Sequence, residues 1–94
     1  MNKRQLIGIA SRRSSLTQEQ TRRALEAILE VIADALEEGD HVTISGFGRF
    51  DVQRYTGRKL HSFDGEGYYQ VEDRRVPVFR SSKLLRKKLR RTDP

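Results

Sequence analysis

The stretch SGFGRFDV, residues 45–52, decides how this chain is expected to fold. Apolar residues alternate with polar ones on both sides of its two glycines: Val42, Ile44, Phe50 and Val52. A period of two indicates strands with one apolar face, and glycines such as Gly46 and Gly48 allow a tight connection between them. The sequence therefore predicts a β-hairpin in the middle of the chain.

Two helices are predicted before this hairpin. Asn2 with Gln5, and Thr17 with Gln20, have the spacing of capping boxes, in which each side chain bonds the other residue's main-chain amide. Further along, apolar residues recur at steps of three and four: Ala24, Leu25, Ile28, Leu29, Ile32, Ala33 and Leu36. Gly39 is a natural helix stop. The first helix is too small to cover this wide stripe, so we expect part of the stripe to contact another subunit.

The second half of the chain predicts an arm, a returning strand and a last helix. Residues 53–74 hold few apolar residues and several glycines, which is typical either of a disordered segment or of a projecting β-ribbon. Residues 75–80 resume an apolar strand pattern. Ser81 or Ser82 then caps a basic helix over residues 82–91, whose leucines are expected to face inward. The order α-α-β-β-arm-β-α is an α+β fold.

The composition indicates a single domain, residues 1–94, with unevenly distributed charge. The chain has no cysteine and no apolar run long enough for a signal peptide or a membrane span, so we expect a soluble intracellular protein without membrane contact. Residues 1–52 carry seven Lys or Arg against eight Asp or Glu, a net −1, whereas residues 53–94 carry twelve against five, a net +7. A basic half-chain favours a polyanionic partner, and nucleic acid fits best.

The sequence lacks the common patterns of catalytic and metal sites. His41 and His61 stand without partners at ligand spacing. Neither a nucleophile elbow nor a Gly-rich phosphate loop ending in Lys-Ser or Lys-Thr is present. We therefore predict no enzyme activity, no metal, no cofactor and no small-molecule substrate.

Three stretches of the chain resemble one known family. MNKRQLI at residues 1–7, GFGRF at residues 46–50 and VPVFRSSKLLRKKL at residues 76–89 are similar to the bacterial HU and integration host factor family. The resemblance covers residues 1–90. It implies an intertwined dimer, either a homodimer or a heterodimer with a related chain, whose two β-ribbon arms enter the minor groove of double-stranded DNA and bend it. It also implies a cytoplasmic, nucleoid-associated protein that uses no cofactor.

On this pattern the chain divides into four parts. They are a helical base, residues 2–39, a β-sheet saddle, residues 41–52 and 75–80, a β-ribbon arm, residues 53–74, and a C-terminal helix, residues 82–91. The apolar residues expected to form the dimer core are Leu25, Ile28, Leu29, Ile32, Leu36, Ile44, Phe47, Phe50, Val52 and Phe79.

Phe63 is an aromatic residue in a polar part of the predicted arm. Arms of the family usually carry an Asn-Pro pair at the tip, and its proline inserts between base pairs. Placing this sequence on that pattern without gaps puts Ser62 and Phe63 at the pair. Three roles for the ring are open: a wedge between base pairs, packing back onto Leu60 or Tyr68, or contact with another protein.

Basic and small residues near the saddle and the arm are the remaining candidates for DNA contacts. The free amides at the start of the last helix favour a phosphate there. The glycines of the turn let main-chain amides approach a phosphate, unless they serve the hairpin alone. The predicted DNA-binding residues are Lys3, Gly46, Gly48, Arg49, Arg54, Arg58, Lys59, His61, Phe63, Arg74, Arg75, Arg80, Ser81, Ser82, Lys83, Arg86 and Lys87.

The charges of the arm leave two functions open. Residues 54–63 contain bases and no acid, whereas residues 64–73 contain acids and no base. These acids either repel phosphates or pair with the basic limb, so we expect weaker DNA binding than the family pattern implies. The first function is an architectural protein that bends or compacts duplex DNA. The second is a scaffold on the same fold whose arms bind a protein or RNA.

Overall fold

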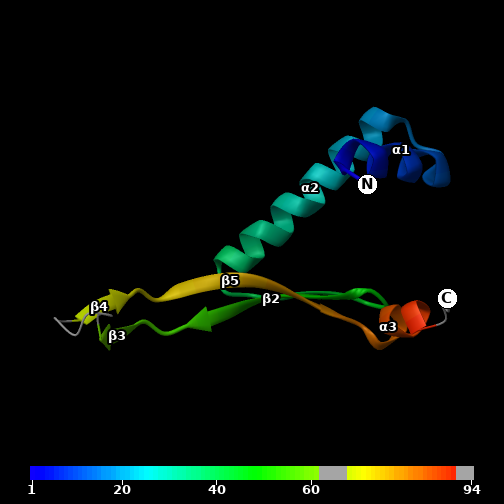
Figure 1. The fold of residues 1–94 in the computed structure, drawn as a ribbon. Coiled ribbons are helices and arrows are strands. Elements are labelled where there is room, and N and C mark those ends of the chain that lie inside the picture. Colours follow the sequence, from blue (N-terminus) through cyan, green and yellow to red (C-terminus); the bar gives the residue numbers. More distant parts are fainter. Residues whose placement is uncertain (62–67, 91–94) are drawn as a thin grey trace. The chain divides into compact units, whose positions relative to one another are not determined.

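The computed structural model describes residues 1–61 and 68–90 (Figure 1). Its elements are α1 (Lys3–Ser14), α2 (Gln18–Glu37), β1 (Val42–Ile44), β2 (Gly48–Tyr55), β3 (Arg58–His61), β4 (Tyr68–Val71), β5 (Arg74–Ser81) and α3 (Lys83–Arg90). The predicted α+β class and order of elements are confirmed. The chain forms two compact units, Met1–Ala35 and Leu36–Pro94, which are described in turn.

Both helices of the first unit begin at the predicted capping boxes. The amide of Gln5 donates to Asn2 Oδ1 at 2.9 Å, and the amide of Asn2 donates to Gln5 Oε1 at 2.9 Å. Thr17 and Gln20 exchange the same pair of hydrogen bonds, each of 3.0 Å, at the start of α2. These bonds satisfy amides that a helix start otherwise leaves without partners, so short local patterns define where both helices begin.

The first unit has a very small core. Among the residues that the structure describes, Ile7 is the single buried apolar side chain, and Ser11 and Thr21 are the buried polar ones. Both hydroxyls are satisfied within the helices, because Ser11 Oγ donates to the carbonyl of Gly8 at 2.8 Å and Thr21 Oγ1 to that of Thr17 at 2.9 Å. One protomer therefore leaves most of the apolar stripe of α2 uncovered.

The second unit begins with the end of α2, at the predicted stop. Gly39 has a φ of 82°, and its amide donates to the carbonyl of Leu36 at 3.0 Å. A left-handed residue after the last helical turn is the usual way to satisfy terminal carbonyls, and glycine adopts that conformation without steric cost.

A three-stranded antiparallel sheet in the order β1-β2-β5 forms the body of the second unit. The predicted hairpin joins β1 to β2, and its turn is closed by the amide of Phe47, which donates to the carbonyl of Ile44 at 3.0 Å. The two glycines of the turn have different roles. Gly46 has a φ of 79°, whereas Gly48 lies against the ring of Phe79, and a Cβ there would meet that ring and the carbonyl oxygen of Arg80 at 2.8 Å.

The pairing of the strands puts the phenylalanines on one face of this sheet, called the apolar face below. The opposite face carries arginines together with the half-buried Val76 and Val78, and it is called the polar face. Directly paired residues of an antiparallel sheet project to the same side. Phe50 pairs with Val42 and with Phe79, and Val52 pairs with Pro77, so these residues share the apolar face. On that face the ring of Phe79 lies 5.1 Å from the ring of Phe50 and 5.4 Å from that of Phe47, tilted in both cases. The predicted alternation is therefore realised in the sheet.

The arm continues from this sheet as a second ladder, β3 with β4 (Figure 1). The three-stranded sheet is longer than predicted, since β2 runs to Tyr55 and β5 begins at Arg74. Both strands extend into residues that the sequence assigned to the arm, because cross-strand pairing continues there without an apolar pattern. Residues 62–67, and with them Phe63, lie outside the described residues.

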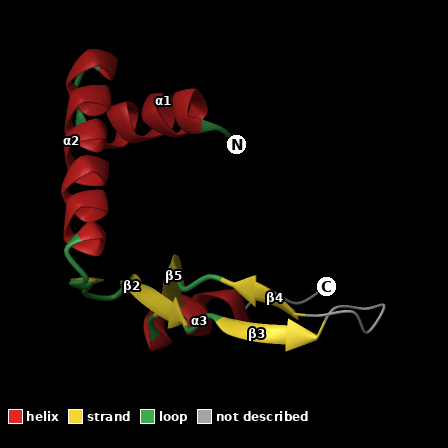
Figure 2. Ribbon diagram, turned by 90° about the vertical axis from the view of Figure 1, so that its left-hand side faces the viewer, coloured by secondary structure: helices red, strands yellow, loops and turns green. Residues whose placement is uncertain are grey.

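Helix α3 is drawn in Figure 2. It begins after Ser82, so of the two candidate serines Ser82 is the cap. Ser82 Oγ accepts from the amide of Leu85 at 3.1 Å, whereas Ser81 is the last residue of β5. In the single chain Leu85 is half-buried, whereas Leu84 and Leu89 are exposed, so the inward orientation of all three leucines stays a prediction. The apolar side of α3 is thus another surface that one protomer leaves uncovered.

Substitution of Gly48 by alanine should destabilise the protein by about 1–3 kcal/mol, because the added methyl would overpack the Phe79 ring and the neighbouring main chain. Gly8→Ala is the matched control. The nearest atom to a Cβ at Gly8 is Arg12 Nη1 at 3.8 Å, so alanine there should stabilise α1 by about 0.5–1 kcal/mol. Urea unfolding at one fixed protein concentration measures both; equal effects would contradict the close packing at Gly48.

Candidate nucleic-acid interface

The polar face of the three-stranded sheet gathers three of the predicted arginines. The register pairs Arg49 with Arg80 and Tyr55 with Arg74, so Arg49, Arg74 and Arg80 project from the same face. Phe50 lies on the opposite face, as the alternation predicted. Arg49 and Arg80 therefore stand directly across from each other on neighbouring strands.

Each arginine of this face has a neighbour on β2. Arg49 Nε lies 3.4 Å from Asp51 Oδ2, Arg80 Nη2 lies 3.5 Å from Gln53 Oε1, and the Arg74 guanidinium lies 5.0 Å from the centre of the Tyr55 ring. Asp51, Gln53 and Tyr55 were not among the predicted site residues. Alternation from Arg49 places Asp51 on this face within the predicted strand, whereas Gln53 and Tyr55 lie beyond residue 52, where that strand was expected to end.

Arg54 and Arg75 are placed differently. They pair with each other on the apolar face of the sheet. Arg75 Nη1 donates to the carbonyl of Glu37 at 2.9 Å, at the C-terminal end of α2. A cation at this end of a helix satisfies a free carbonyl and complements the helix dipole. The structure thus gives Arg75 a structural contact within its own unit.

The turn and the start of α3 are joined by a main-chain hydrogen bond. The amide of Ser82 donates to the carbonyl of Phe47 at 2.9 Å, and Gly46 lies beside Leu84. Arg86 Nη1 bonds the carbonyl of Ser81 and lies 3.2 Å from its hydroxyl. The amide and hydroxyl of Ser82 are therefore both engaged within the protein, while Lys83 and Lys87 are exposed.

Lys3 belongs to an ionic network in the first unit. Its Nζ lies 3.3 Å from Glu26 Oε1, and Glu26 Oε2 accepts from Arg22 Nη1 at 2.9 Å. Arg22 also bonds Glu19. The hydrogen bond from Arg22 lowers the pKa of both carboxyl groups, and that from Lys3 further lowers the pKa of Glu26. Lys3 therefore forms an ion pair with the carboxylate of Glu26.

The predicted contacts of the arm are only partly described. The main chain of β3 pairs Arg58 with Val71, Lys59 with Gln70 and His61 with Tyr68. The side chains of these residues and the whole of Phe63 fall outside what the structure describes.

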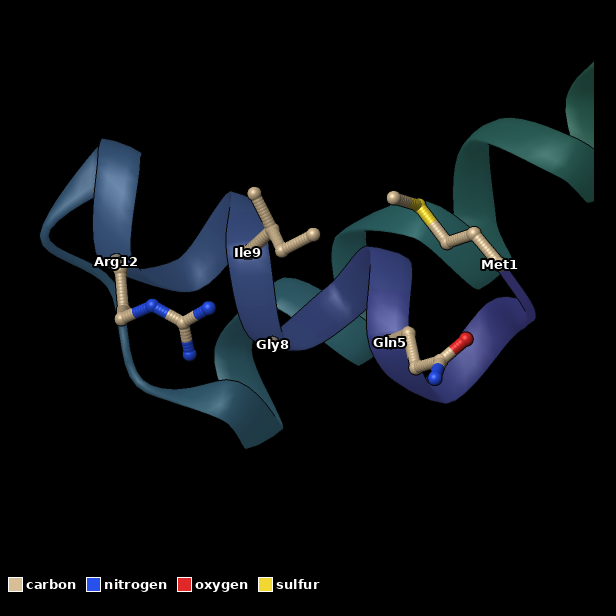
Figure 3. Close-up of a pocket in the computed structure, with 5 residues that line it drawn as sticks. All are labelled: Met1, Gln5, Gly8, Ile9 and Arg12. Atoms are coloured by element: carbon tan, nitrogen blue, oxygen red, sulfur yellow. The ribbon is translucent and has the colours of Figure 1, made fainter.

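Three further features of the described residues concern metal ligands, helix hydropathy and surface hollows. Within residues 1–61 and 68–90, no group of three or more His, Cys, Asp or Glu is placed to hold a metal ion. None of the described helices is long and apolar enough to span a membrane. A hollow of about 530 Å³ on α1 is lined by Met1, Gln5, Gly8, Ile9 and Arg12, none of which was a predicted site residue (Figure 3).

Comparison with known proteins gives consistent matches over nearly the whole chain. The family described as "Bacterial DNA-binding protein" matches residues 1–90. The chain is 37% identical over 86 residues to DNA-binding protein HU-alpha of Vibrio proteolyticus, covering 92% of this chain and 96% of that protein. It is 34% identical over 89 residues to DNA-binding protein HU of a Nostoc species, covering 95% of each.

Solved structures agree with these sequence matches. An Anabaena HU–DNA cocrystal structure superposes with a TM-score of 0.82 at 34% identity and covers 95% of this chain and 97% of that chain. HU from Thermotoga maritima superposes with a TM-score of 0.69 at 29% identity, covering 95% and 98%. The chain therefore belongs to the bacterial DNA-binding protein family that includes HU.

Proposed function

We propose that this protein is an architectural DNA-binding protein that acts as a dimer, contacts the phosphates and minor groove of duplex DNA, and bends or compacts it. It works in the bacterial cytoplasm in association with the nucleoid. We propose no catalytic role. A scaffold that binds protein or RNA in place of DNA is not favoured, because the relatives are DNA-binding proteins and one similar structure contains DNA.

The observation that carries this proposal is the pairing of Arg49 with Arg80. Like charges directly opposite each other destabilise an antiparallel sheet. Here Asp51 offsets the charge of Arg49 in part, whereas Arg80, among the described residues, bonds only the neutral Gln53. A polyanion laid across this face would relieve the repulsion and gain charge-assisted hydrogen bonds from both guanidinium groups. The arrangement costs stability in the free protein and is useful when phosphates are present.

Uncovered apolar surface supports the dimer. Ile28 is 53% exposed and Phe47 is 46% exposed in the single chain. A hollow of about 500 Å³ beside Phe47 is lined on its other side by Leu84 and Leu85. Burying such residues is the main source of stability in a small protein. We propose that a second chain covers them, and either an identical or a related chain would fit.

The arms complete the proposed interface. Basic residues of β3, Arg58, Lys59 and His61, would follow the phosphates of the groove. Phe63 would insert as a wedge, since unstacking one base step costs a few kcal/mol and is offset by contacts along the bent duplex. The support for this part is the sequence pattern of residues 54–63 and the family to which the chain belongs.

If the dimer provides the core, the midpoint of thermal unfolding should rise with protein concentration. Ile28→Asp should abolish the dimer and leave an unfolded chain, because a charge would face the interface. Ala27→Asp adds the same charge to an exposed position outside the apolar stripe and should remain dimeric. Sedimentation equilibrium measures the oligomeric state of both variants, and circular dichroism measures whether they are folded. A folded monomer that is independent of concentration would refute the dimer.

Arg80→Ala should weaken duplex binding and make the plot of log affinity against log salt less steep, by about 0.9 for each phosphate that the variant no longer binds. Arg75→Ala is the comparison, because its guanidinium is held on the opposite face by the Glu37 carbonyl and its removal should leave the slope unchanged. Gel-shift titrations over a salt series measure both. An unchanged slope for Arg80→Ala would remove the polar face from the interface.

Phe63→Ala should reduce duplex bending while much of the affinity remains, because phosphate contacts and the wedge act separately. Phe63→Pro restores the residue typical of the family at this place and should keep the bend. Energy transfer between dyes on the two duplex ends measures the angle, with gel shifts as the measure of affinity. Equal bending by all three proteins would rule out the wedge.

A further inference from the structure

The ladder of the arm is interrupted at its root. Tyr55 pairs with Arg74 in one ladder, and the next pair, in the other ladder, is Arg58 with Val71. The register is the same on both sides, so two residues of each strand, 56–57 and 72–73, lie between the ladders without strand pairing. The break appears as loop between the strand arrows (Figure 2). A ribbon bends most easily where ladder hydrogen bonds are missing.

One side-chain contact bridges this break, and a second lies at its edge. Asp73 Oδ1 accepts a hydrogen bond from the amide of Gly57, so a carboxylate replaces a main-chain acceptor across the gap. The Arg74 guanidinium lies over the Tyr55 ring at 5.0 Å, on the last pair before the gap. These four residues are called the root clasp below. Both contacts run from one strand to the other, so they resist relative movement of the two strands across the gap and at its edge.

The surroundings of the root clasp connect it to the body of the second unit. An open hollow of about 400 Å³ is lined by the clasp residues Tyr55, Asp73 and Arg74 together with Arg54, Thr56 and Arg75. Arg75 follows Arg74 and is bonded to the end of α2 through the carbonyl of Glu37. The descending strand is therefore held on both sides at the place where the arm begins.

We propose that the root clasp sets the direction in which the arm leaves the sheet, so that Asp73 and Arg74 are positioning residues for DNA binding. The consequence for DNA rests on the proposed function; the clasp itself does not. An arm already held in its bound direction loses less conformational freedom on binding, which strengthens binding without adding a phosphate contact. On this account an acid in the arm favours DNA binding, although its charge opposes phosphate.

The test compares two substitutions of one residue. Asp73→Ala removes the acceptor for the Gly57 amide, whereas Asp73→Asn keeps an acceptor oxygen and removes the charge. Hydrogen exchange of the Gly57 amide in the free protein should accelerate about two- to tenfold in the alanine variant, as for the loss of one net hydrogen bond, and stay near the parent rate in asparagine. Equal rates in the parent and Asp73→Ala would overturn the clasp, whatever the protein binds.

Duplex binding then tests its consequence. Asp73→Ala should lose about two- to tenfold in affinity at an unchanged salt slope and bend the duplex over a wider range of angles, and Asp73→Asn should restore both. Glu72→Gln removes the same charge from the neighbouring position as a control for electrostatics. If Asp73→Ala, Asp73→Asn and Glu72→Gln all bind more tightly, simple repulsion explains Asp73 and the positioning role is wrong. If exchange behaves as expected but the parent ignores duplex DNA, the clasp stands and the proposed function fails.

Discussion

The pairing of β2 with β5 is the constraint on which the described second unit depends. Its register puts Phe50 against Phe79 on one face and Arg49 against Arg80 on the other. A slip of one residue between the strands would move the side chains of one strand to the opposite face and separate Phe50 from Phe79. Such a slip would bring a residue with a side chain to the place of Gly48. A Cβ at that place would collide with the Phe79 ring, so the close contact of Gly48 opposes the slip. Core packing and the placement of charge are thus set by the same pairing.

Local signals in the sequence predicted most of the elements. The partners of the charged residues could not be predicted in this way, for a physical reason. Capping boxes at Asn2 and Thr17 and the stop at Gly39 join residues close in sequence, and all three were found as predicted. The contact of Arg75 with Glu37 spans 38 positions. No pattern of residue types reveals such a contact, because it depends on how strands and helix pack.

The uncovered apolar surface follows from the short length of the chain. The chain has 94 residues, and β3, β4 and the segment between them belong to the arm. Few residues therefore remain to form a core. Only Ile7 is buried among the apolar residues that the structure describes. The proposed second chain would supply the missing packing and would add a second polar face and a second arm. Stability and a two-armed interface would then follow from one association.

Two acidic residues near the proposed interface have specific contacts, and they do more than lower the net positive charge. Asp51 sits 3.4 Å from Arg49, and both side chains are partly exposed. An exposed ion pair of this kind contributes about 0–1 kcal/mol, so a phosphate can replace Asp51 as the partner of Arg49 at small cost. Until then the pair reduces the repulsion between Arg49 and Arg80. Asp73 has a different role, because it bonds a main-chain amide that the interrupted ladder leaves free. Net charge alone therefore gives an incomplete account of the proposed DNA-binding surface.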